Sequence, residues 1–541
     1  MKRSILALVI VTALFTISQS PSLVANPQGA GSERLDLVEA TVDDLQKAIQ
    51  TGLVTIEQLT QMYLARIAAY DDAGPGVNAF LHVNAAAASH ASELDALRHA
   101  GITRGPLYGI PVLLKDNIDT ADMPTTAGSV ALNGSIPPDD AFIAARLRAA
   151  GAVIMGKATL TEYANFIAIG MPTGYSSLGL FGFNPYDPRP LPGGDGRPVL
   201  QTGGSSSGSG IGVNANLAAV AIGTETSGSI LSPASANGVV GIKPTVGLVS
   251  RDGIIPITAD QDTAGPIART VTDAAILLGV IAGYDPNDPA TAPCLVPGNC
   301  FSDYRQFLNK KALKGARIGL LPIPANRLAI MNAAVAVLRA EGAIVEDVVA
   351  PPNQRGSCTA YPIPTGCSSV LLYGQKRDLN AYLANTPDAP MNTIADIVAF
   401  NATYVPPMKY GQAIFEAAAQ VDVTPGSADT LRYEADRAYD LANSRPQLDA
   451  IYAQYDAILA SANSFAGTPA KAGYPSITVP GGFLPPAAPI VNPFPSGVTF
   501  SGPAFSEPKL IGLAYAFEQA TRHRLPPAST PPLPSDTVIK Q

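Results

Sequence analysis

The sequence predicts an α/β fold, built as one large domain around a largely buried sheet. Short apolar segments bounded by turn residues alternate with helical patterns along most of the chain, and this alternation is typical of α/β proteins. Hydrophobic residues make up 47% of the 541 residues and charged residues only 14%, so a large core can form. No internal repeat or clear linker divides the chain.

Helices are expected first after the N-terminal segment. Thr41 with Asp44 and Thr55 with Gln58 have the spacing of capping boxes, in which a side chain at each of the two positions bonds the main chain of the other. An alanine-rich helix is expected near residues 84–100.

Strands and helices then alternate. Val112 to Leu114 form a short apolar run between turn residues, which is typical of a buried strand. Residues 139–166 are expected to form a helix, a strand and a helix, and residues 170–202 a loop. A helix, a strand and a turn are expected in 211–230, and a strand, a helix and a strand in 316–351. Residues 350–440 are expected to be mostly helical with inserted loops, followed by a strand in 473–482 and a helix in 510–521.

The N-terminus has the pattern of a signal peptide at residues 1–25. Lys2 and Arg3 precede an almost wholly apolar run from Ile5 to Ile17, which is short for a bilayer span but suits a signal-peptide core. An uncleaved anchor is the alternative. We expect an exported protein, periplasmic or secreted, with no membrane contact after leader removal. Its net charge is −8, so the sequence lacks the excess of basic residues that indicates nucleic-acid binding.

The four cysteines agree with export, because they fall as two close pairs in Pro- and Gly-rich stretches. Four cysteines allow three pairings, and short loops favour Cys294 with Cys300 and Cys358 with Cys367 in an oxidising compartment. Zinc binding is the alternative, but neither pair has CxxC spacing and no histidine lies close in sequence. No metal and no cofactor are expected.

The run "TGGSSSGSG" at 202–210 admits several interpretations. A flexible linker fits the composition, but strand-like segments flank the run. A phosphate-binding loop needs a lysine beside its glycines, and the run has none. Residues 204–208 also match the G-x-S-x-G nucleophile elbow, which would make Ser206 the nucleophile and His523, the one histidine downstream, its base.

A hydrolase with few histidines can instead use lysine as its base, and Lys115 is the candidate. An ordinary lysine has a pKa of about 10.4 and is protonated at neutral pH, whereas burial lowers that pKa. The apolar segment "PVLLK" is the kind of surrounding that provides such burial. A lysine exposed at the end of a strand is the alternative.

Three segments together resemble the amidase signature family of serine hydrolases: "GIPVLLKDNID" at 109–119, "GGSSSGSG" at 203–210 and the long run at 223–256. The likeness covers nearly the whole mature chain, with a catalytic domain at 33–530 that is more variable over 280–460. Within the family, the chain looks most like the bacterial peptide amidases. The resemblance implies a mixed central sheet covered by helices on both faces, and cleavage of a C–N amide bond through an acyl-enzyme.

The family uses a Ser–cis-Ser–Lys triad, which the motifs carry over to this chain. Lys115 becomes the base, Ser205 the bridging serine after a cis peptide bond, and Ser229 the nucleophile in the second Gly/Ser turn. Main-chain N–H groups around the nucleophile would form the oxyanion hole, and two side chains would support the site. The oxyanion hole would use the N–H groups of Thr226, Ser227, Gly228 and Ser229. The supporting side chains would be those of Ser206 and Glu225.

The chain departs from the family pattern beside the nucleophile. Glu225 stands where aspartate is commoner, Ser227 replaces a glycine or aspartate, and Leu231 stands where many members carry arginine. Extra loop is also present at 188–202, either shaping the mouth of the site or lying inert on the surface. The three substitutions bear on substrate preference more than on the triad.

The leading expectation is an exported hydrolase of primary amides, such as small molecules or C-terminal peptide amides. A second possibility is a glutaminase of the amidotransferase A-subunit type, which works with partner proteins in the cytoplasm; the leader argues against it. A third is a non-catalytic protein that binds amides or peptides on the same scaffold, a role that would not require all three triad residues. The sequence leaves the acyl-group preference and the oligomeric state open.

Overall fold

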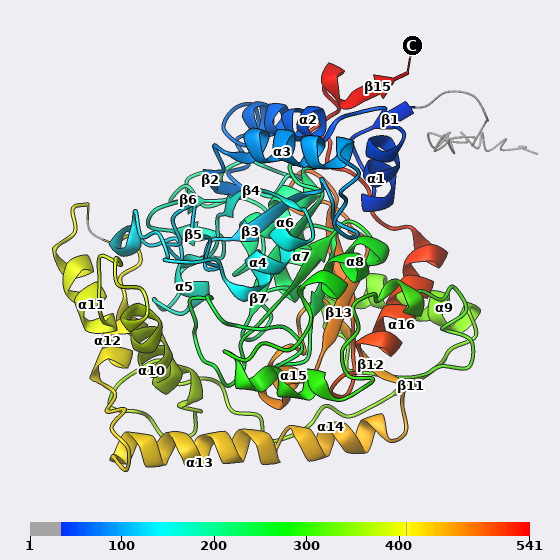
Figure 1. The fold of residues 1–541 in the computed structure, drawn as a ribbon. Coiled ribbons are helices and arrows are strands. Elements are labelled where there is room, and N and C mark those ends of the chain that lie inside the picture. The colour runs from blue at the N-terminus through cyan, green and yellow to red at the C-terminus, as the bar shows by residue number, and fades with distance from the viewer. Residues whose placement is uncertain (1–33, 407, 541) are drawn as a thin grey trace, which may run out of the picture.

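An 11-stranded sheet runs through the centre of the protein (Figure 1). The computed structural model describes residues 34–406 and 408–540, so the predicted signal peptide at 1–25 lies outside the described residues. The strands run in the order β11 (Ile344–Asp347), β10 (Arg317–Leu320), β12 (Ala457–Ser461), β14 (Phe494–Ser501), β13 (Ser476–Leu484), β8 (Val240–Lys243), β9 (Thr263–Ala268), β7 (Val220–Glu225), β3 (Pro111–Lys115), β4 (Val153–Ala158) and β2 (Phe80–Val83).

The sheet is mixed, as the family resemblance implies. Strand β3 pairs in parallel with β4 and β7, whereas β7, β9, β8, β13, β14 and β12 pair in antiparallel fashion in that order. Because parallel neighbours end at the same edge of a sheet, the end of β3 at Lys115 lies beside the end of β7 at Glu225. This edge brings together two of the sequence segments that carry the motifs.

Two short helices, α6 (Ser207–Asn214) and α7 (Leu231–Ala236), cover one face of the sheet. Successive strand residues point to opposite faces, and Gly241 of β8 faces α7. A Cβ at Gly241 would lie 2.7 Å from Ala234 Cβ and 3.0 Å from Ile230 Cγ2. The absent side chain therefore lets α7 approach the sheet closely.

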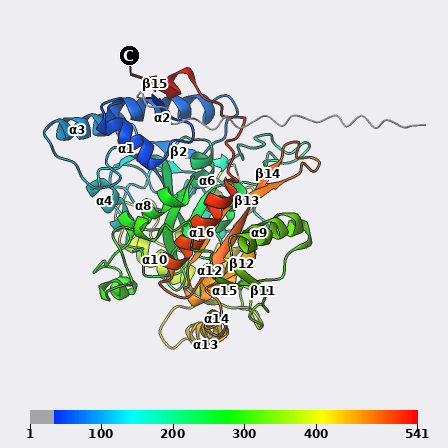
Figure 2. The ribbon, with the colours of Figure 1, turned by 90° about the vertical axis from the view of Figure 1, so that its right-hand side faces the viewer.

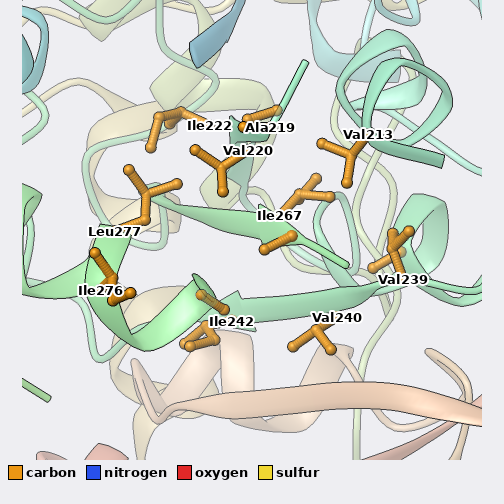
Figure 3. Close-up of a cluster of buried hydrophobic side chains, with 14 of the residues drawn as sticks. Val213, Ala219, Val220, Ile222, Val239, Val240, Ile242, Ile267, Ile276 and Leu277 are labelled. Carbon is orange, nitrogen blue, oxygen red and sulfur yellow. The ribbon is translucent and has the colours of Figure 1, made fainter. Parts of the chain in front are cut away.

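Helices α8 (Val271–Ile281), α9 (Leu328–Ala340) and α16 (Glu507–Thr521) cover the opposite face. Figure 2 shows α9 and α16 lying over β13 and β14. In the core between the layers, Ile222 and Ile242 of the sheet pack near Ile276 and Leu277 of α8 (Figure 3). Burial of such apolar surface is the main favourable contribution to folding.

The remaining helices surround this core. Those predicted from the two capping boxes begin after Thr41 and Thr55, and both boxes are formed. Within the described residues, no helix has the length and apolar character needed to span a bilayer. The bounds are α1 (Val42–Gln50), α2 (Ile56–Tyr70), α3 (Ala87–His99), α4 (Phe142–Ala149), α5 (Glu162–Asn165), α10 (Val370–Ala384), α11 (Ile394–Thr403), α12 (Ala413–Gln420), α13 (Ala428–Ala442), α14 (Arg445–Tyr452) and α15 (Gly467–Ala472).

One helix expected within 139–166 is present only as the four-residue turn α5. Tyr163, Ala164 and Asn165 have φ values of 43°, 54° and 72°, a left-handed conformation that regular helices exclude. The carboxylate of buried Glu162 accepts hydrogen bonds from the N–H and hydroxyl of Ser177, both at 2.8 Å. This anchor holds the chain in a tight bend that the local helical pattern does not reveal.

The segment expected to be mostly helical, 350–440, contains α10 to α13, and Figure 1 shows α13 and α14 along the lower edge of the molecule. The cysteines pair as loop length favours. Cys294 joins Cys300 with Cα atoms 5.0 Å apart, and Cys358 joins Cys367 with Cα atoms 5.1 Å apart.

The two ends of the described chain meet, because β1 (Arg34–Asp36) pairs with β15 (Thr537–Ile539). Beneath this pair, the fully buried guanidinium of Arg66 forms an ion pair with Asp536. Arg66 also donates to four main-chain carbonyl groups, two in the segment after α6 and two near the C-terminal end of the described chain. They are those of Ala215 and Asn216 and those of Thr530 and Pro531.

We expect Asp536→Ala to destabilise the protein by about 3 kcal/mol, because removing one partner leaves a buried charge without its counter-charge. Thermal unfolding should then occur several degrees lower. Asp36→Ala is the matched control, because Asp36 is 46% exposed in its pair with Arg34 and such pairs contribute about 0–1 kcal/mol. Equal unfolding temperatures for the two variants would contradict the expectation.

Candidate active site

Lys115 is the last residue of β3, and its side chain is fully buried. Its Nζ lies 2.7 Å from Ser205 Oγ and 2.8 Å from Thr224 Oγ1, and it donates to the Thr224 carbonyl at 3.2 Å. Asn117 Nδ2 donates to the same Thr224 hydroxyl at 3.1 Å. The amine is thus held in one place, with the Ser205 hydroxyl within reach for proton transfer.

Burial lowers the pKa of Lys115 to about 7, because an apolar surrounding disfavours the charged ammonium. The carboxylates of Asp262 and Glu225 act in the opposite direction and limit the decrease. A substantial neutral fraction of the amine therefore exists at neutral pH. The alternative of an exposed lysine at a strand end is wrong.

Ser205 follows two glycines that leave no space for side chains. Gly203 has φ of 68°, and a Cβ there would lie 2.6 Å from the Ser232 carbonyl oxygen. The Gly204–Ser205 peptide bond is cis, as the family resemblance implies. The Ser205 carbonyl accepts a hydrogen bond from Thr161 N–H at 3.0 Å. This bond fixes the main chain of Ser205.

Ser229 lies in the turn between β7 and α7 and is 7% exposed. Its carbonyl accepts a hydrogen bond from Ser206 N–H at 3.2 Å, so the two Gly/Ser turns are joined directly through their main chains. The structure therefore brings Lys115, Ser205 and Ser229 to one site, at the shared edge of β3 and β7.

Glu225 holds the Ser229 turn in shape. Its buried carboxylate accepts hydrogen bonds from the N–H groups of Gly228 at 2.6 Å, Ile230 at 2.7 Å and Leu231 at 3.1 Å. The longer side chain, where family members commonly have aspartate, reaches around the turn from the end of β7. Glu225 therefore supports the turn by binding three of its main-chain N–H groups.

The expected oxyanion donors need one correction. Gly228 N–H points to Glu225 Oε1, and a donor engaged in this way is not offered to a substrate oxygen. The N–H groups of Thr226, Ser227 and Ser229 remain as candidates, and the side chain of Ser227 is exposed at the surface of the turn.

Ser206 does not have the geometry of a nucleophile. Its fully buried Oγ donates to the Thr224 carbonyl at 3.0 Å and accepts from Thr224 N–H at 3.1 Å. His523 lies elsewhere, beside Phe517 at the end of α16. The nucleophile-elbow hypothesis is therefore contradicted, and Ser206 instead fixes the strand that carries Thr224.

Three further residues belong to the site and were not identified from the sequence: Thr224 and Asn117, described above, and Asp262. Asp262 accepts a short hydrogen bond from the Thr226 hydroxyl and bonds from the N–H groups of Ile257 and Thr258 at 2.8 and 2.9 Å. Burial raises the pKa of Asp262 to about 6, against these donors. Thr224 lies inside the motif segment 223–256 and Asp262 follows it by six residues, but nothing in their spacing distinguishes them from their neighbours.

The extra loop at 188–202 connects two other surface loops. The carboxylate of Asp195 accepts a hydrogen bond from Tyr410, and its main-chain carbonyl accepts one from Lys409. At the other end, Arg189 donates to the Pro489 carbonyl at 3.0 Å. These contacts fix the loop to its surroundings.

The chain is similar to known proteins over most of its length. The sequence profile of the Amidase family matches residues 58–511. A probable amidase of Arabidopsis thaliana is 40% identical over 504 residues, which cover 92% of this chain and 93% of that protein. A putative amidase of Schizosaccharomyces pombe is 35% identical over 530 residues, covering 92% of this chain and 87% of that protein. A component of the glutamyl-tRNA(Gln) amidotransferase of Rhodopirellula baltica is 32% identical over 529 residues, covering 91% of this chain and 98% of that protein.

Among solved structures, the native peptide amidase from Stenotrophomonas maltophilia superposes with a TM-score of 0.80 and 43% identity. The match covers 91% of this chain and 99% of that chain. The family profile, the sequence identities and the shared architecture lead to one conclusion: the chain belongs to the amidase signature family and is an amide-hydrolysing enzyme.

Proposed function

We propose that the protein is an exported hydrolase of primary amides, acting on C-terminal peptide amides through a Ser–cis-Ser–Lys triad. The observation that carries the proposal is the fully buried Lys115 amine, 2.7 Å from the Ser205 hydroxyl. A neutral amine in this position can act as a base at neutral pH. The similarity to a peptide amidase supports the choice of substrate.

In the proposed mechanism, neutral Lys115 takes a proton from Ser205 while Ser205 takes one from Ser229. The Ser229 oxygen attacks the amide carbonyl, and N–H groups of Thr226, Ser227 and Ser229 stabilise the oxyanion. Such a preorganised donor typically contributes about 3–4 kcal/mol to transition-state stabilisation. The relay returns the proton to the leaving nitrogen, ammonia departs, and water hydrolyses the acyl-enzyme. No cofactor takes part in any of these steps.

Export is supported by two features. The sequence begins with the signal-peptide pattern described above, and both cysteine pairs lie at disulfide distance. Disulfides form and persist mainly in oxidising compartments.

The proposal predicts ammonia release from amidated peptides. We expect an amidated dipeptide to have a kcat/KM at least about tenfold above that of acetamide, because contacts with the acyl group supply binding energy used in the transition state. An ammonia assay over a graded series, from acetamide to N-acetylated dipeptide amides, measures this. Free glutamine belongs in the series, because a preference for it would favour the glutaminase alternative, and no release from any amide would overturn the proposal.

A further inference from the structure

A cavity of about 350 Å³ lies between the end of the 188–202 loop, helix α7 and the hairpin that joins β13 to β14. This volume suits a small ligand group. Apolar and polar side chains line it together, among them Gln201, Ser232, Arg327, Asn463, Ile490 and Phe494.

The cavity adjoins the proposed nucleophile. Ser232 N–H donates to the Gly228 carbonyl at 2.8 Å, and Ser232 Oγ accepts from Gly204 N–H at 3.4 Å. Across the turn, a Cβ at Gly228 would lie 3.3 Å from Asn463 Nδ2. The wall formed by Ser232 and Asn463 thus touches the glycines that flank both active-site serines.

Arg327 gives the cavity its charge. It is the only charged residue among those that line the cavity, and in the described part of the chain its half-buried guanidinium has no carboxylate partner. Burial is the one influence on its pKa, which it lowers. By contrast, Arg251, which lines a different cavity, is paired with Asp288 at 2.5 Å.

The other polar groups around Arg327 can complement it. The amide groups of Gln201 and Asn463 and the hydroxyl of Ser232 can all donate hydrogen bonds. A cation with neutral donors and apolar walls is suited to a carboxylate on a short carbon chain, because a planar guanidinium binds carboxylates with strong, charge-assisted bonds.

We propose that this cavity binds a carboxylate on the acyl group of the substrate, so that the enzyme prefers acidic peptide amides. The inference rests on the proposed function. In hydrolysis of a primary amide the leaving group is ammonia, so every other part of the substrate belongs to the acyl group. A cavity that touches the flanks of Ser205 and Ser229 is therefore available to that group alone.

The test compares N-acetylated dipeptide amides that contain Glu or the similarly sized neutral residue Met. One pair carries the difference at the amidated residue and the other at the residue before it. In at least one pair, Arg327→Gln should lower the Glu-to-Met ratio of kcat/KM by about tenfold, and Arg327→Lys should restore part of it. Arg339→Gln is the control and should leave the ratio unchanged, because Arg339 is an exposed cation in the last turn of α9, the helix that begins directly after Arg327.

Binding separates the two proposals. On the inactive Ser229→Ala protein, calorimetry with the Glu-containing amides should show Kd weakened about tenfold by Arg327→Gln. One outcome would overturn the carboxylate site while the proposed function stands. The native protein hydrolyses the amides, Arg327→Gln changes the Glu-to-Met ratio of kcat/KM less than twofold in both pairs, and Arg327→Gln leaves Kd unchanged. Arg327-dependent binding with no hydrolysis of any amide by the native protein would overturn the function while the site stands.

Discussion

Ser229→Ala should lower kcat/KM for an amidated dipeptide by at least about 10⁴-fold, because the substitution removes the atom that forms the acyl-enzyme. The turn itself should keep its shape, since Glu225 holds it through the N–H groups of Gly228, Ile230 and Leu231, which the substitution leaves in place. Ammonia release measures the rate, and circular dichroism measures the integrity of the fold.

Ser206→Ala is the matched control for this prediction, because it makes the same serine-to-alanine change at a residue whose N–H bonds the Ser229 carbonyl. It removes two hydrogen bonds to Thr224 and should destabilise the protein by about 1–3 kcal/mol, with a much smaller effect on the rate. If Ser206→Ala abolished activity in a folded protein while Ser229→Ala remained active, the assignment of the nucleophile would be wrong.

Lys115→Met should be inactive at pH 7, because methionine has nearly the length of lysine but cannot accept a proton. In the native protein, kcat/KM should fall about tenfold per pH unit below pH 7, as the amine becomes protonated. The sign follows from the pKa of Lys115, which burial lowers to about 7. Above that pH the amine is mostly neutral, so the rate should reach a plateau.

Asp262→Asn gives an independent check on this assignment. The Asp262 carboxylate raises the pKa of Lys115, so its removal should lower that pKa and move the acid limb of the profile to lower pH. Asparagine keeps an oxygen that can accept the Thr226 hydroxyl. A limb that stays in place, or moves to higher pH, would show that an amine other than Lys115 controls the rate.

The sequence predicts the local features well and the contacts across strands poorly. The two capping boxes depend on residues three positions apart, and both are present. Thr224 meets Lys115 only through the pairing of β7 with β3, and one sequence does not specify that register. The motifs alone do not show that Thr224 holds the amine.

Irregular composition hides other elements. Strand β9 reads "TAGPIA" and β14 reads "FPSGVTFS", and their glycines and prolines weaken the strand pattern. In the site, the motif predicts that the turn carrying Ser229 supplies the oxyanion hole, but it does not predict which N–H groups of that turn are free. The direction of the Glu225 carboxylate decides this, because it engages Gly228.

The contact between the two ends of the described chain has a consequence for biosynthesis. Arg66 lies near the beginning and its partner Asp536 near the end, with a sequence separation of 470 residues. Contacts between such distant residues form late, because the intervening chain must first be brought together. The region around Arg66 therefore cannot reach its final packing while the ribosome is still translating. The contact between Arg66 and Asp536 can close only after residue 536 has been synthesised, so this side of the molecule stays open during most of translation.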